Sequence, residues 1–321
     1  MLEQTLWHPV AAQADLAAAP LALTLLGQPL VLWCDCAGTA RAFADRCPHR
    51  GTPLSMGHVH QGRLECAYHG WQFDGGGRCV HIPAGPGHVP APSHAVRAHE
   101  VQAGHGLWWV RLEVGDNASV VPAPAGLLPR QVVCGPYDVA TSAPRVVENF
   151  LDTSHFGFIH EGGLGERAHT AVPAYDVVAG PGGAPCVPQY RAWQPQASAS
   201  AAGGAWVEYR YEVLSPYSAL LVKQATQAEG APQEAYALWV SPVAPEASRV
   251  WFTLYTSDSA SSDEQLRAFQ HHIFTQDQPV LEAQLPRCLP LQGAEVHSAA
   301  DRLSTAYRRY LRTQGISFGV C

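Results

Sequence analysis

Short apolar runs fill residues 7–112, and Gly, Pro and Asp separate one run from the next. The runs at residues 30–33 and 107–110 consist of Leu, Val and Trp, which favour β-strands. Short strand-like runs bounded by turn formers predict an all-β domain. The composition changes at residues 115–129, where Gly, Ala, Asn and Pro gather. Because this mixture disfavours both helix and strand, it predicts an interdomain connection.

The second half of the chain alternates apolar and polar positions. Along residues 206–213, Val and Tyr alternate with Glu and Arg, which predicts a strand with one buried face and one face in solvent. Similar runs at 217–222, 236–240 and 250–255 predict an antiparallel meander. A helix beginning near Ser262 is expected to cover this sheet, since an N-cap residue precedes apolar positions at helical spacing. A curved sheet around a long helix would enclose a cavity.

The predicted fold class is α+β, with an all-β domain at residues 1–114, a connection at 115–135 and a second domain at 136–321. The chain has 321 residues, of which 47% are hydrophobic and 15% are charged, enough for two packed domains. Residues 21–33 are apolar, but Gly-Gln-Pro at 27–29 interrupts them. They are too short for a membrane span of about 20 residues and predict two strands joined by a turn.

Charge and cysteine content exclude several classes of protein. The net charge is −7, there is no basic run, and Lys223 is the only lysine, so no nucleic-acid partner is expected. The N-terminus carries Glu3 and no secretory signal, which predicts a cytoplasmic protein. Nine cysteines in such a chain do not indicate a disulfide framework. Cys34 and Cys36 lack a nearby His or second Cys pair and are not expected to bind metal.

Two Cys-His pairs carry the strongest chemical signal. Cys47-Pro-His49 and Cys66-Ala-Tyr-His69 supply two thiolates and two imidazoles, which suit a [2Fe–2S] cluster of mixed ligation. Such a cluster is a one-electron carrier at roughly −150 to +300 mV, above an all-Cys ferredoxin near about −400 mV. Structural zinc is the alternative, although zinc motifs usually pair Cys with Cys and His with His.

A second candidate metal site lies at residues 149–160, NFLDTSHFGFIH. His155 and His160 lie about 140° apart on an ideal helix, so both can face one metal only if the helix is distorted or ends nearby. Gly157 is expected to permit that distortion. The alternative is that both are hydrogen-bonded core histidines.

Two histidines need a carboxylate to complete a facial triad, which leaves other iron positions free for dioxygen or water. Asp277 is the predicted third ligand, because helical spacing places it in a stripe with the apolar residues of the expected helix. In the alternative, Pro279 restarts the helix and Asp277 caps it. Glu282 is the reserve candidate. The stripe comprises Leu266, Phe269, Ile273, Asp277, Val280 and Gln284.

The segments CPHRGTPLSMG and CAYHGWQFD resemble the Rieske domain of bacterial Rieske non-haem iron oxygenases, and the resemblance runs over nearly the whole chain. It implies a Rieske domain followed by a helix-grip catalytic domain, a [2Fe–2S] cluster held by the two Cys-His pairs, and mononuclear Fe(II). The segment DQPVLEAQ is similar to the family's third-ligand segment, which supports Asp277. The Asn149-x-x-Asp152-x-x-His155 pattern implies Asn149 and Asp152 as catalytic residues.

In this family Asp152 would bridge His69 of a neighbouring subunit and His155, and the resemblance implies a homotrimer with head-to-tail packing. The expected function is the terminal oxygenase of an electron-transfer system, fed by a separate NAD(P)H-dependent reductase with a flavin and a plant-type cluster, with or without a ferredoxin. The chain resembles the shorter vanillate and dicamba O-demethylases. Hydroxylation or oxidative O- or N-demethylation of a small aromatic or heterocyclic substrate is therefore expected.

Two other functions stay open at this stage: cis-dihydroxylation of an aromatic ring, and a Rieske electron carrier with a ligand-binding domain that does no chemistry. Arg191, Arg210 and Lys223 are candidates to anchor a substrate carboxylate. Aromatic residues of the second domain could line an apolar pocket. They are Trp193, Trp206, Tyr209, Tyr211, Trp239, Trp251 and Tyr255.

Overall fold

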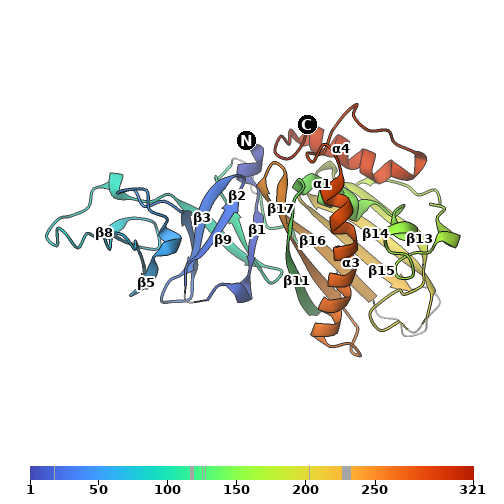
Figure 1. The fold of residues 1–321 in the computed structure, drawn as a ribbon, viewed down its shortest axis with the longest axis horizontal. Helices are drawn as coiled ribbons and strands as arrows, with labels where there is room; N and C mark the ends of the chain where they lie inside the picture. The colour runs from blue at the N-terminus through green and yellow to red at the C-terminus, as the bar shows by residue number, and fades with distance from the viewer. Residues whose placement is uncertain (18, 116–118, 125, 127, 202, 226–232) are drawn as a thin grey trace. The chain divides into compact units, whose positions relative to one another are not determined.

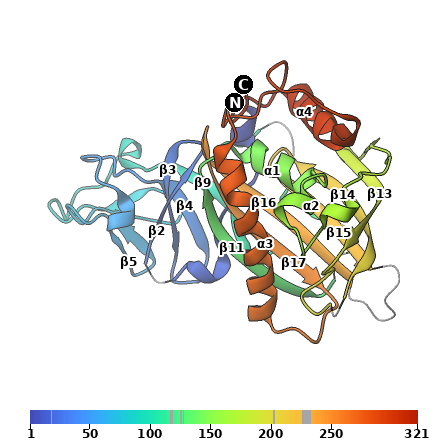
Figure 2. The same cartoon turned by 45° about the vertical axis from the view of Figure 1, so that its right-hand side comes forward.

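The computed structural model describes residues 1–17, 19–115, 119–124, 126, 128–201, 203–225 and 233–321. These residues form two compact units. The N-terminal unit is Glu3–Val121, and the second unit is Pro122–Cys321 with Met1–Leu2. In Figures 1 and 2 the colour runs from blue in the N-terminal unit to red at the end of the second.

The N-terminal unit is built from short antiparallel strands. They are β1 (His8–Ala12), β2 (Leu21–Leu25), β3 (Gln28–Cys34), β4 (Ala40–Ala44), β5 (His58–His60), β6 (Arg63–Glu65), β7 (Gln72–Phe73), β8 (Cys79–His81), β9 (Ala98–Gly104) and β10 (Leu107–Arg111). One sheet has the order β1-β10-β9-β4-β3-β2, and a smaller one has the order β5-β6-β7-β8. Its described residues include 3-10 turns but no α-helix, so the all-β prediction is confirmed.

The predicted hairpin at residues 21–33 is present as β2 and β3. Leu26 and Gly27 join the strands with φ of 51° and 73°. Positive φ at both central residues is what a tight two-residue hairpin turn requires. Trp33, at the end of β3, is fully buried and meets the ring of Phe43 edge-on at 5.4 Å.

The core of this unit extends to the Cys-His pairs. Leu64 and Phe73 from the small sheet pack in one cluster of buried residues with Trp33, Cys47 and Cys66. Packing the cysteines into a close-packed core fixes the loops that carry them.

A seven-stranded antiparallel sheet forms most of the second unit. Its strands are β11 (Arg130–Val139), β12 (Val178–Ala179), β13 (Pro185–Gln194), β14 (Ala205–Ser215), β15 (Ser218–Ala225), β16 (Gln233–Ala244) and β17 (Ala247–Thr256), in the order β11-β17-β16-β15-β14-β13-β12. The four predicted strands correspond to β14, β15, β16 and β17, and each is longer than predicted. The expected meander is confirmed.

The connection predicted at residues 115–135 overlaps β11, because residues 130–134 already pair with β17. The pairing register shifts between Cys134 and Tyr137, around Gly135-Pro136. Gly and Pro usually signal a loop, but here they form an irregularity inside a strand. The two contact units divide between Val121 and Pro122.

In the part of the chain that the structure describes, the α-helices that accompany this sheet are α1 (Ala143–Leu151), α2 (Phe156–Ile159), α3 (Asp263–Ala283) and α4 (Arg302–Gln314). α3 lies across the sheet (Figures 1 and 2) and contacts β11 and α1. The predicted N-cap is present, since Ser262 Oγ accepts a hydrogen bond from Gln265 N at 3.2 Å. The short 3-10 turns of the chain are η1 (Leu2–Thr5), η2 (Gln13–Asp15), η3 (Leu54–Met56), η4 (Pro92–His94), η5 (Arg167–His169), η6 (Pro181–Gly183) and η7 (Ala299–Asp301).

The buried face of α3 differs in part from the predicted stripe. Asp277 is buried at 7% exposure, but Val280 is 39% exposed, and Leu281 occupies the buried row instead. Leu281 lies four residues after Asp277 and so stays on the same face. The helix continues through Pro279 to Ala283, so the alternative in which Asp277 caps a restarted helix is wrong. Among the described residues, no helix combines the length and apolar character that crossing a membrane requires.

Candidate metal centres

Residues 47–52 and 66–71, which we call the Cys-His loops, have the same backbone arrangement. In each loop the cysteine N–H donates to the carbonyl oxygen five residues later, at 2.8 Å from Cys47 and 2.9 Å from Cys66. Each cysteine carbonyl also accepts a hydrogen bond from a glycine, Gly51 or Gly70. Both glycines have positive φ, 78° and 68°, a conformation that disfavours other residues. The loops therefore present their side chains in matching ways.

The four side chains converge, with the thiols on the inside. Cys47 and Cys66 are each 2% exposed, and neither forms a disulfide. The rings of His49 and His69 lie 4.5 Å apart between centroids. His49 is half-buried and His69 is exposed. The imidazole side of this group thus faces outward.

Aromatic side chains flank both imidazoles. Trp71 stacks on His49 at 4.6 Å with an interplanar angle of 5°, and Tyr68 lies 3.8 Å from the His69 ring. Trp71 is buried, as a side chain that shields the imidazoles from water must be. Tyr68 is 63% exposed and does not meet this condition.

This donor set fits a [2Fe–2S] cluster. Burial, together with the neighbouring Cys66, raises the pKa of the Cys47 thiol to about 11, so the thiolate needs a cation to form. His49 Nδ1 is buried and has no hydrogen-bond partner within the described residues. Two buried thiols and an imidazole nitrogen without a hydrogen-bond partner are the donor atoms that mixed ligation of a cluster would use.

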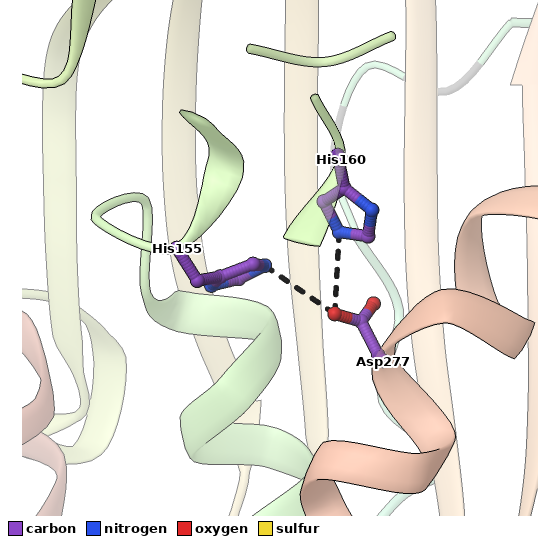
Figure 3. A group of neighbouring side chains, drawn as sticks. All are labelled: His155, His160 and Asp277. Carbon is purple, nitrogen blue, oxygen red and sulfur yellow. Dashed lines mark ion pairs between the residues drawn. The ribbon is translucent and has the colours of Figure 1, made fainter. Parts of the chain in front are cut away.

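The second centre consists of His155, His160 and Asp277, which we call the triad (Figure 3). One ligand atom from each lies within 4.8 Å of the others. Asp277 Oδ1 is 3.2 Å from His160 Nε2 and 3.5 Å from His155 Nε2. The structure therefore brings the three predicted ligands together from two segments that are distant in sequence.

The two histidines reach one point because α2 is a single short helix between them. His155 precedes it with φ −78° and ψ −14°, and His160 leaves it with φ −110° and ψ 34°. The helix therefore ends at the second histidine, as the spacing of the two histidines requires if both are to face one metal. Gly157 keeps negative φ, and a Cβ there would meet Glu166 O at 3.0 Å. Gly157 thus allows close packing, and the expected role in distorting the helix is not observed.

Each imidazole is oriented through its other nitrogen. His155 Nδ1 lies 2.9 Å from Asp152 Oδ2, and His160 Nδ1 lies 2.8 Å from Gln276 Oε1. An oxygen acceptor at Nδ1 leaves Nε2 to face a metal. Gln276 was not predicted from the sequence, where its one signal is its position next to Asp277.

Electrostatics at the triad favour positive charge. Burial lowers the pKa of His160, but the Asp277 carboxylate and Gln276 outweigh burial and raise the pKa above its usual value. Burial raises the pKa of Asp152, yet the hydrogen bonds from His155 and Ser154 outweigh it, so Asp152 stays ionised. Asp277 Oδ1 has no hydrogen-bond partner of good geometry in the described part of the chain. Two imidazoles and a carboxylate with this charge balance fit a divalent iron ion.

Two other candidate residues, Glu282 and Asn149, lie outside the triad. Glu282 accepts hydrogen bonds from Ala140 N and Gln278 Nε2, and it is not part of the triad group. Asn149, in the last turn of α1, lines the cavity beside the triad.

The triad lies in the wall of a cavity that is partly open to solvent. Of the predicted aromatic residues, Tyr209 and Tyr211 line it, whereas Trp193 and Trp206 line a separate hollow. Trp239, Trp251 and Tyr255 are buried and outside both linings. Lys223 lines the cavity, but Arg191 and Arg210 do not. The other lining residues are Val146, Phe150, Phe156, Leu164, Leu221, Tyr236, Leu238, Phe252, Phe269, Gln270, Ile273 and Phe274.

Comparisons with known proteins assign both units. Residues 6–95 match the Rieske [2Fe-2S] domain, and residues 139–314 match the vanillate O-demethylase oxygenase C-terminal domain. The methylxanthine N3-demethylase NdmB of Pseudomonas putida is 30% identical, over 97% of this chain and 89% of its own length. The dicamba O-demethylase oxygenase component of Stenotrophomonas maltophilia is 33% identical, over 71% and 69%.

A solved structure gives the same result. Pseudomonas putida CBB5 NdmA with caffeine superposes with a TM-score of 0.82 and 28% identity, over 96% of this chain and 90% of that one. The chain thus belongs to the Rieske non-haem iron oxygenases, as a terminal oxygenase component of the vanillate O-demethylase-like type whose cofactors are a Rieske [2Fe–2S] cluster and a mononuclear iron.

Proposed function

We propose that this oxygenase removes a methyl group from a small, flat aromatic or heterocyclic compound. In such a reaction one atom of O2 enters a methyl C–H bond, the resulting hydroxymethyl group leaves as formaldehyde, and the other oxygen atom becomes water with two electrons and two protons. The observation that carries the proposal is the triad at the wall of an aromatic-lined cavity. Relatives with demethylase activity support this choice over cis-dihydroxylation.

Residue roles follow from the geometry. Cys47 and Cys66 would hold one iron of the cluster, and His49 and His69 the other, which would supply single electrons. The triad would hold the mononuclear iron, which supplies reductive activation of O2 when bound. A carrier that does no chemistry has no use for a buried triad beside a cavity. The aromatic walls would orient the ring and exclude water from the methyl group.

Asp152 is proposed to link the two centres. It already holds His155 through Nδ1, and it lines a second hollow together with Val296, which is 99% exposed. The Asp152 side chain is 25% exposed, so it is accessible to a neighbouring subunit that docks at this hollow. In a closed homotrimer, the exposed His69 of that neighbouring subunit would reach Asp152.

The electrons are proposed to come from a separate NAD(P)H-fed reductase with a flavin and a plant-type [2Fe–2S] cluster, directly or through a ferredoxin. An exposed His69 supports this role, since an electron must enter the cluster from another protein. The related dicamba O-demethylase protein is the oxygenase component of its system, which supports a separate electron donor.

The test is turnover by the reconstituted oxygenase with a surrogate reductase and NADH, across N-methylated and methoxylated rings. Demethylation predicts substrate-dependent O2 uptake with formaldehyde released in equal amount. A cis-diol product without formaldehyde would assign dihydroxylation instead. Substrate-independent O2 consumption across the whole panel would contradict the proposal.

A further inference from the structure

The only lysine of the chain is buried inside the cavity. Lys223 is 5% exposed, lies on β15 and lines the same cavity as the triad. Its direct cross-strand neighbour on β16 is Glu234, which is 1% exposed. Lys223 Nζ lies 3.2 Å from Glu234 Oε2. A buried ion pair is weak evidence for stability, because desolvation offsets much of the attraction. Its position in the substrate cavity therefore calls for another explanation.

Within the described residues, the ammonium group has one N–H without an acceptor. Lys223 Nζ donates to Ala197 O at 2.8 Å and pairs with Glu234. An ammonium has three N–H donors, and no acceptor for the third is found among the described residues. Its surroundings are aromatic, with the Tyr236 ring at 5.0 Å and the Phe269 ring at 6.0 Å. A buried donor in an apolar setting favours a ligand that accepts its hydrogen bond.

Lys223 faces α3 at Phe269, which is separated along the helix from Asp277 of the triad. Phe269, which faces Lys223, precedes Asp277 by eight residues on α3, a rise of about 12 Å along the helix. A ring compound with its methyl group near the triad can thus place its opposite edge toward Lys223.

Glu234 determines whether a charged or a neutral substrate group is favoured beside Lys223. The carboxylate neutralises Lys223, and Tyr236 OH also donates to it at 3.3 Å. A substrate carboxylate would therefore add an uncompensated negative charge to a buried site. A neutral acceptor, such as a ring carbonyl oxygen, would take the free N–H without that cost.

We propose that Lys223, neutralised by Glu234, is a specificity-determining residue that donates a hydrogen bond to a carbonyl oxygen of a neutral heterocyclic substrate, on the edge opposite the methyl group. The sequence had suggested Lys223 as an anchor for a carboxylate; the ion pair changes the expected ligand to a neutral one. This inference rests on the proposed demethylation, whose substrate class it narrows.

The test uses the double variant Lys223→Met with Glu234→Gln, which removes both charges together and leaves no unpaired ion. The control is Arg210→Met with Glu212→Gln, a more exposed ion pair in the same sheet that does not line the cavity. Binding to the anaerobic holoenzyme is measured by calorimetry. The probes are caffeine, a neutral ring with carbonyl oxygens, and 4-methylanisole, a neutral ring without one.

The double variant is expected to raise the Kd of caffeine by about tenfold or more and to leave that of 4-methylanisole within about twofold. The control variant should change neither. Equal weakening of both probes, or an unchanged Kd for caffeine, would overturn the inference. So would a parent enzyme that binds caffeine no more tightly than 4-methylanisole.

A second variant tests the charge argument. Glu234→Gln alone leaves Lys223 without its counter-ion, so the affinity for 4-methoxybenzoate should rise relative to that for caffeine. A parent that already prefers 4-methoxybenzoate would show that the substrate is an anion and contradict the proposal. If no probe yields formaldehyde while the binding pattern holds, the proposed demethylation fails and the role of Lys223 stands.

Discussion

The Cys-His loops and the triad differ in how they are built and in how much water reaches them. The loops lie within 25 residues of one another, bury their thiols and leave His69 exposed. The triad joins residues 117 positions apart, and its His160 is 1% exposed. An exposed imidazole suits the entry or exit of an electron. A buried set of ligands suits chemistry from which water must be excluded.

The difference also appears in what holds the ligands. Backbone turns around Gly51 and Gly70 fix the Cys-His loops. In the triad, side chains do this work, since Asp152 and Gln276 hold the two imidazoles by Nδ1. The first centre should therefore be sensitive to changes in the loops and the second to side-chain substitutions around it. The account predicts that each centre can be removed without the other.

Asp277→Ala should have the largest effect on the second unit. Removing the only carboxylate of the triad should abolish binding of the mononuclear iron and all turnover, a loss beyond the about 10–100-fold typical of outer hydrogen-bond partners. The Rieske cluster should remain. Iron analysis and the electron paramagnetic resonance of the reduced cluster check both points. Glu282→Ala on the same helix is the control and should keep the mononuclear iron. Loss of this iron from Glu282→Ala but not from Asp277→Ala would show that Glu282 is the ligand.

Cys66→Ser is the matching change in the N-terminal unit. It removes one of two thiolates for the cluster, so the visible absorption and reduced-cluster resonance should vanish and turnover with NADH should stop. The triad should still bind one iron per chain. Cys79→Ser, at another buried cysteine of the same core, is the control and should retain the cluster. Loss of iron from the triad as well would show that the two regions are not independent.

Asp152→Ala should leave both centres loaded and slow the transfer between them. Stopped-flow measurement of cluster oxidation by O2 in the presence of substrate should show a rate lower by about 10–100-fold, with both centres loaded at saturating iron. Asp152→Asn keeps an oxygen acceptor for His155 Nδ1 and separates orientation from charge. A variant that reoxidises its cluster as fast as the parent would remove the linking role.

Gln276→Ala is expected to have the smallest effect of these four. His160 would lose the acceptor at Nδ1 but keep Nε2 for the metal, so iron affinity should fall by about tenfold. Gln276→Glu restores an acceptor and should recover most of the affinity. Competition with a chelator measures this affinity. No change in Gln276→Ala would show that packing alone orients His160.

The sequence predicted those features that depend on residues close together in the chain. The Cys-His pairs, the β2–β3 hairpin, the cap at Ser262 and the four strands of the meander all depend on neighbours within a few residues. Asp277 was found because helical periodicity places it on a buried face, although Val280 was assigned to that face wrongly.

Features that depend on pairing between distant segments were not predicted. Strand β11 carries Gly135-Pro136, which indicates a loop unless the partner strand β17 is known. The pairing of Lys223 with Glu234 depends on the register between β15 and β16. Likewise, the sequence could not separate Tyr209 and Tyr211, which line the cavity, from buried aromatic residues such as Trp239 and Tyr255, because it does not show which face each strand presents.

The central claim is that this chain holds two separate iron centres, a cluster on the Cys-His loops and a single iron at the triad. Quantifying iron, zinc and acid-labile sulfide per chain in anaerobically reconstituted protein tests it most directly. The account predicts three iron atoms and two sulfides, without zinc. Zinc in place of iron, or no acid-labile sulfide, would contradict it.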